Sequence, residues 1–157
     1  MNSSEIKNQI KLTNIIYLAL LSGLIIFFIL VIILIQIKTP EENKDLDFIF
    51  TFLVPVFGLA MMFVSRIIYN QMISKYDSDS SIMQKISYFR TAKIISWAIV
   101  EGACFLALVA TILTSNYLYV AVFILLLGYF IMMRPTNESL IRDMRLNSEE
   151  SELILRK

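Results

Sequence analysis

The stretch LTNIIYLALLSGLIIFFILVIILIQI, residues 12–37, decides the fold class of this chain. It holds 26 uncharged residues between Lys11 and Lys38. A helix needs about 20 mostly apolar residues to cross the hydrocarbon core of a bilayer, so this stretch is long enough to span it. It is too long for the core of a signal peptide, and no small-residue cleavage site follows it. We therefore expect it to be retained.

Three further apolar stretches follow the first one. The four together cover about residues 13–37, 48–68, 94–113 and 117–133. Each is continuously apolar and does not alternate, which favours helices over barrel strands. Soluble helices would need a polar face, which these stretches lack. The sequence therefore predicts an all-α protein, an integral membrane four-helix bundle over residues 1–134.

The composition indicates a single domain with no catalytic or nucleic-acid-binding role. The chain has 157 residues, of which 57% are hydrophobic and 17% are charged, whereas about a quarter are charged in soluble domains. Its net charge of +1 gives no basic footprint for nucleic acid. It has no His, the commonest general base and metal ligand, and no Gly-rich phosphate loop. We expect no enzymatic activity, no cofactor and no metal site.

The basic residues are divided unevenly between the two sides of the predicted bundle. Only Lys38 and Lys44 fall on the side away from the termini, whereas twelve fall on the side with the termini. Lys and Arg favour the cytoplasmic side of short loops, so we expect both termini in the cytoplasm. In a bacterium the membrane would be the cytoplasmic one. The twelve are Lys7, Lys11, Arg66, Lys75, Lys85, Arg90, Lys93, Arg134, Arg142, Arg145, Arg156 and Lys157.

The tail over residues 135–157 predicts two short amphipathic helices. Thr136 and Ser148 are suitable N-caps for them, because a hydroxyl can accept a hydrogen bond from the first turn. The first piece has an apolar face opposite its charged residues. Two interpretations remain open: the helices lie on the membrane surface, with Arg142 and Arg145 in contact with it, or they pack against a partner protein.

Glu101 is the one charged-type residue deep within a predicted span. It is the eighth residue counted from Ile94, which places it about 12 Å into the membrane. An acid there costs at least a few kcal/mol, so it must face protein or water, be neutral, or have a partner. Tyr129, Ser22 and Tyr17 are the candidates for hydrogen bonds to it, since they are expected at similar depths.

Small residues gather at the predicted depth of Glu101. Because small residues let membrane helices approach closely, we expect a narrow packed waist around the acid. Two roles for Glu101 are open: it bonds a neighbouring helix or subunit, or it binds and releases a proton or cation. The small residues at this level are Gly23, Gly58, Ala60, Gly102 and Gly128.

The stretch WAIVEGACFLALVA, residues 97–110, resembles the proton-carrying helix of the ATP synthase c subunit. The resemblance implies that Glu101 is an ion-binding carboxyl. This chain departs from that family in three ways: the preceding helix lacks repeated glycines, the loop has no Arg-X-Pro, and two more helices flank the hairpin. EGA at residues 101–103 and RPT at 134–136 also resemble an uncharacterised family of small four-helix membrane proteins of Bacteroidota, which implies no particular activity.

Two functions follow as hypotheses from different classes. In the first, the chain is a non-catalytic oligomeric or accessory subunit of a membrane complex, whose partners are the lipid bilayer, copies of itself or other membrane proteins. In the second, it is a proton- or cation-translocating module that uses Glu101. Small size and amphipathic tails favour the first, and one intramembrane acid favours the second.

Overall fold

The computed structural model describes residues 3–37, 44–75 and 80–155, and these residues form six α-helices and no strands. The prediction of an all-α protein is confirmed. Lys38, Arg156 and Lys157, which enter the charge distribution above, lie outside the described residues. The helices are α1 (Ser3–Ile37), α2 (Lys44–Ser74), α3 (Ile82–Thr114), α4 (Leu118–Met132), α5 (Asn137–Asp143) and α6 (Ser148–Leu155).

Three of these helices, α1, α2 and α3, are long and apolar enough to cross a membrane. A fourth candidate span exists if α4 and α5 count together, although the chain bends by 73° between them. α4 alone has 15 residues and is therefore about 22 Å long, which is shorter than a hydrocarbon core of about 30 Å. Several long apolar helices are thus compatible with a membrane protein.

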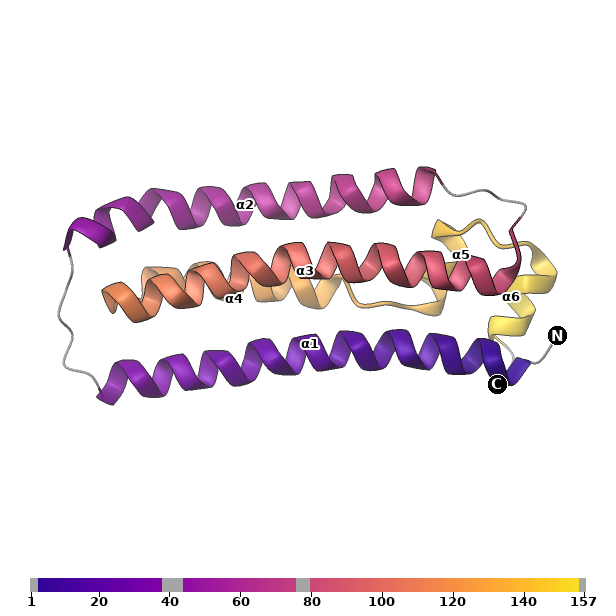
Figure 1. The fold of residues 1–157 in the computed structure, drawn as a ribbon, viewed down its shortest axis with the longest axis horizontal. Helices are drawn as coiled ribbons and strands as arrows, with labels where there is room; N and C mark the ends of the chain where they lie inside the picture. The colour runs from indigo at the N-terminus through magenta and orange to yellow at the C-terminus, as the bar shows by residue number, and fades with distance from the viewer. Residues whose placement is uncertain (1–2, 38–43, 76–79, 156–157) are drawn as a thin grey trace.

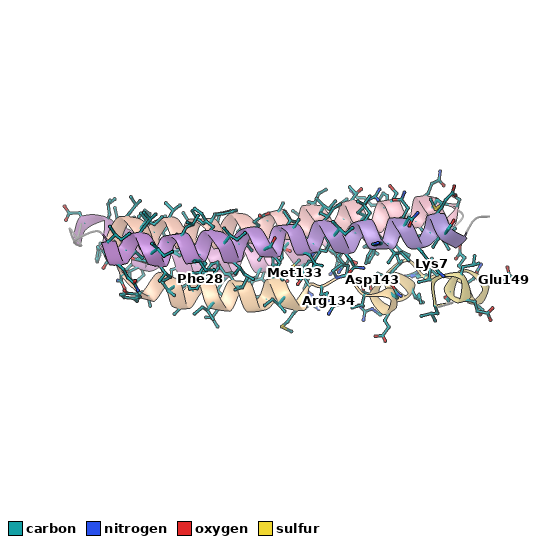
Figure 2. All side chains as sticks on the ribbon, turned by 90° about the horizontal axis from the view of Figure 1, so that it is seen from below. Lys7, Phe28, Met133, Arg134, Asp143 and Glu149 are labelled. Carbon is teal, nitrogen blue, oxygen red and sulfur yellow. The ribbon has the colours of Figure 1, made fainter. Side chains whose placement is uncertain are left out.

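α3 is the centre of the bundle (Figure 1). It packs against α2, α4 and α1, and α1 and α2 lie on either side of it. α1, α2 and α3 form a layer, and α4, α5 and α6 lie along one face of that layer (Figure 2). The other face of the layer carries no helix from the described residues. The first turn of α1 and the last turn of α6 lie at one end of the bundle, which we call the termini end.

α1 contacts the bundle along a narrow seam. Its buried side chains recur at intervals of seven or four residues, which is the spacing of a left-handed helix–helix contact. The outward sides of the helix are apolar as well, and several large side chains there are about half exposed. This helix is apolar on every side but buried along a single seam, which is compatible with apolar surroundings. The seam consists of Ile6, Thr13, Tyr17, Leu24 and Val31.

Two separate apolar clusters hold the helices together. The larger one, which we call the apolar cluster, joins the four helices α1, α2, α3 and α4 and includes Trp97, Cys104 and Phe123. The smaller one, the termini cluster, joins both tail helices to the beginnings of α1 and α3. Its buried members are Ile6, Ile82, Ile86, Phe89, Leu140, Met144 and Ile154.

The apolar faces of the two tail helices are therefore covered by this chain itself. Sequence reasoning left open a membrane surface or a partner protein, and the structure provides a third solution in which Leu140 and Ile154 are buried within the bundle. Thr136 caps α5 as predicted, because its Oγ1 accepts from Ser139 N at 3.1 Å. The predicted Ser148 cap is wrong: Asn147 Oδ1 accepts from the backbone of the first turn of α6 at 2.8 Å.

The helices continue beyond the predicted spans at the termini end. α2 runs to Ser74 although its apolar stretch ends near residue 68, and α3 begins at Ile82 although its stretch begins at Ile94. The continuous apolar stretches end where polar residues such as Asn70 and Lys85 begin, but the helices continue there because the termini cluster gives the added turns a buried face. At the opposite end a tight turn joins α3 to α4, with Ser115 in the left-handed region at φ 54°.

Candidate functional site

α3 presents Glu101 at the edge of its uncovered face. The inner side of this helix is buried in the apolar cluster, where Val100 and Cys104 are fully buried. On the uncovered face Ala98 and Gly102 are exposed, and Glu101 is half-buried beside them. Residues three and four apart share a helix face, so the carboxyl lies at the rim of the uncovered face. It does not lie inside the bundle.

Two glycines at the level of Glu101, one on α1 and one on α3, face open space. One turn farther along α3, Phe105 packs against Phe27 of α1 with ring centroids 5.1 Å apart. α1 and α3 run in the same direction, so Gly23, one turn before Phe27, lies at the level of Glu101. A Cβ added to Gly23 or Gly102 would meet no atom within 4 Å.

The three hydroxyls expected to bond Glu101 bond backbone carbonyls instead. Tyr17 donates to a carbonyl of α4 at 3.3 Å, and Tyr129 donates to a carbonyl of α2 at 3.3 Å. Ser22 is exposed and donates to a carbonyl of its own helix at 2.9 Å. In an apolar helix a nearby carbonyl satisfies a hydroxyl without any second side chain, which explains this arrangement. Of the expected supporting residues, only Gly102 lies beside the acid.

The predicted packed waist is also wrong. Only Gly58 serves close packing, since a Cβ there would stand 3.3 Å from Leu126 Cδ1, where α2 meets α4. Gly23, Gly102 and Gly128 face open space. Small residues at a shared depth therefore do not converge on one point, because each helix turns its own glycine in a direction set by its buried seam.

Glu101 is without a partner in the part of the chain that the structure describes. No described residue donates a hydrogen bond to its carboxylate or forms an ion pair with it. An unpaired carboxyl that faced lipid would be costly unless it carried a proton or received a donor from outside this chain. Such a group can bind a proton or a cation, or accept a hydrogen bond from a second helix.

A second polar group lies at the termini end, where α2, α3 and α5 meet. Tyr69 Oη donates to Asp143 Oδ2 at 2.6 Å, and Arg142 Nε lies 3.0 Å from Asp143 Oδ1. The ammonium of Lys93 stands 4.5 Å from the ring centroid of Tyr69. Arg142 and Arg145, predicted to contact the membrane surface, are both exposed and lie together beside α2.

Sequence reasoning missed the two polar contacts that close the ends of the bundle. Lys85 Nζ lies 2.9 Å from Glu150 Oε1, with side chains only 8% and 16% exposed. At the opposite end, the Asp47 carboxylate accepts from Tyr119 Oη at 2.7 Å and from Asn116 Nδ2 at 3.0 Å. These partners stand 65 to 72 positions apart in sequence, so no local spacing could have signalled them.

The described residues contain no group of three or more Cys, Asp or Glu side chains placed to hold a metal ion. Comparison of the chain with protein-family models, with curated proteins and with solved structures found no match.

Proposed function

We propose that this chain is a multi-pass membrane protein in which α1, α2, α3 and α4 are the four spans. The termini end lies in the cytoplasm. The exposed apolar surface supports the membrane insertion. In the most apolar 18-residue segment of α1 only 11% of the residues are buried, and in the corresponding segment of α2 only 17% are. So much exposed apolar surface would drive aggregation in water but is compatible with lipid. The bias of basic residues toward the termini end supports the orientation.

Its function is that of a non-catalytic subunit that associates through the uncovered face of α3. The observation that carries this proposal is Glu101, a half-buried carboxyl without a described partner, at the edge of a face lined by Ala98 and Gly102. Small residues allow a second helix to approach closely, and a polar group then gains a donor or acceptor on that helix. The occupant proposed here is a second copy of this chain, because each copy presents the same small residues and the same carboxyl to the other.

Gly102→Cys in a Cys104→Ala background is expected to form a disulfide-linked dimer when membranes are oxidised. Gly102 lies on the proposed contact face, and a side chain there has open space in front of it. Ser22→Cys in the same background is the matched control, since Ser22 is exposed on α1 at a similar depth. The readout is the dimer band on a non-reducing gel. Equal cross-linking at the two positions would contradict the proposal.

Glu101→Leu is expected to weaken the dimer, whereas Glu101→Gln should largely keep it. Each interhelical hydrogen bond in a membrane contributes about 1 kcal/mol, so losing a symmetric pair weakens association roughly 30-fold. Gln keeps a donor and an acceptor at the same position, and Ser22→Leu is the control for added apolar surface. Light scattering in mild detergent measures the mass. A monomeric wild type, or an unchanged Glu101→Leu dimer, would contradict the role of Glu101.

The same carboxyl supports a second candidate, proton or cation translocation. Glu101 is half-buried at the rim of the uncovered face and has no described partner, so an ion could reach it from that face. This candidate predicts that wild-type protein in liposomes dissipates a pH gradient and that Glu101→Gln abolishes the flux. If wild type and Glu101→Gln behave alike, translocation through Glu101 is excluded, and the role in association remains to be judged from the mass measurement.

A further inference from the structure

A groove at the termini end separates the last turns of α2 from the end of α5, and it encloses about 400 Å³. The end of α2 and α5 lie next to each other there (Figure 1), joined by the hydrogen bond between Tyr69 and Asp143. The groove is polar on both sides. Its walls include Tyr69, Asn70 and Ser74 from α2, and Arg142, Asp143 and Arg145 from the facing segment.

The groove has an excess of positive charge. Arg142 and Arg145 line it together with one carboxylate, that of Asp143, and the Lys93 ammonium stands over the ring of Tyr69. Asp143 is already occupied, since one oxygen accepts from Tyr69 and the other from Arg142 Nε. The Arg142 side chain is 77% exposed, so its terminal nitrogens remain directed to solvent. Guanidinium groups in this situation bind phosphate oxygens well, often through two parallel hydrogen bonds.

The position of the groove along α2 relates this charge to a lipid. Tyr69 and Asn70 directly follow the apolar stretch that ends near residue 68. On the apolar side, Phe63 and Ile67 of α2 are 68% and 53% exposed. Arg66 is also exposed and lies one turn before Asn70 on the same helix face. Apolar side chains below a basic groove match the acyl chains and the phosphate of one phospholipid molecule.

We propose that this groove binds the phosphate of an anionic phospholipid headgroup, held between Arg142 and Arg145 with polar contacts from α2. The inference rests on the proposed membrane insertion, because only insertion brings the groove to headgroup depth. It assigns the two arginines to one lipid site and not to a diffuse attraction between the protein and the membrane.

The test measures lipid retention by native mass spectrometry of the full chain, released from nanodiscs made of equal parts phosphatidylcholine and phosphatidylglycerol. The Arg142→Gln/Arg145→Gln double variant is expected to bind phosphatidylglycerol about 100-fold more weakly, at about tenfold for each guanidinium that hydrogen-bonds the phosphate. Lys7→Gln/Lys11→Gln is the matched control. It removes the same charge from exposed sites on α1, at the same end of the bundle, and should retain the lipid. Arg142→Lys/Arg145→Lys keeps the charge without the planar fork and should bind at an intermediate level.

Each other outcome overturns the assignment. Equal loss in the Gln double variant and in the Lys7/Lys11 control would mean a general attraction to anionic lipid, and no loss in either would mean no site. Binding of inorganic phosphate in lipid-free detergent, abolished in the Arg142/Arg145 variant, would assign the groove to a soluble phosphate ligand. Membrane insertion is judged separately, by whether the wild-type chain sediments with membranes after carbonate extraction.

Discussion

Glu150→Ala is expected to release α6 from the bundle and to destabilise the termini cluster by about 3 kcal/mol, because it leaves the buried Lys85 ammonium without its partner. The Lys85 side chain is 8% exposed and its Nζ lies 2.9 and 3.0 Å from the two carboxylate oxygens of Glu150. Breaking a buried ion pair from one side costs about 3–5 kcal/mol, and the partial exposure of Glu150 places this pair at the lower end. Amide hydrogen exchange in α6 should accelerate about 100-fold.

Three further variants separate the ion pair from the helix cap. Glu150→Gln should cost less, because Gln can still accept from Asn147 N, as Glu150 Oε2 does at 3.1 Å. Glu149→Ala is the matched control, since Glu149 is exposed in the same helical turn (Figure 2). Lys85→Met/Glu150→Leu should recover most of the protection, because an apolar pair of similar volume replaces the buried charges. Exchange in Glu150→Ala no faster than in Glu149→Ala would show that the ion pair contributes nothing.

The sequence predicted the long helices because their signal is local. A run such as residues 12–37 is apolar without interruption, and no tertiary information is needed to recognise it. The helix ends were harder to predict. The last turns of α2 and the first turns of α3 are stabilised by burial in the termini cluster, which depends on side chains as distant as Leu140 and Ile154.

The surroundings of Glu101 could not be predicted from depth alone. Depth along each span correctly placed Gly23 near the level of Glu101, but it says nothing about the direction in which a side chain points. Tyr17 and Tyr129 lie at suitable depths and are turned toward backbone carbonyls of neighbouring helices. The direction of each side chain depends on which seam its helix buries. That seam is set by the packing of the helix against α3, which brings together residues far apart in sequence.

Trp97→Ala is expected to be the most damaging substitution in the apolar cluster, with a loss of about 3 kcal/mol. Trp97 is fully buried where three helices meet: its ring centroid lies 5.3 Å from that of Tyr17 in α1, and its Nε1 donates to Met133 O at the end of α4. Tyr17 in turn stacks on Phe130 at 5.6 Å. Truncation of a buried Trp costs about 3–5 kcal/mol in soluble proteins.

The lower end of that range applies if the bundle lies in lipid as proposed, because lipid chains are as apolar as the protein interior. The loss then comes from van der Waals contacts around the cavity and from the broken N–H to carbonyl bond, and not from transfer out of water. Trp97→Phe retains most of the ring volume and should lose only about 1 kcal/mol for the hydrogen bond, plus a small packing defect.

Phe63→Ala is the matched control for Trp97→Ala, since Phe63 is 68% exposed on α2 and its truncation opens no cavity. Unfolding followed by the helical circular dichroism signal in a detergent titration ranks the variants, and the expected order of stability is wild type and Phe63→Ala, then Trp97→Phe, then Trp97→Ala. If Trp97→Ala unfolded at the same detergent concentration as Phe63→Ala, the junction of α1, α3 and α4 would not be the point that holds α4 in the bundle. In that case the contacts of α4 with α2, at Gly58 and Tyr129, would have to hold it.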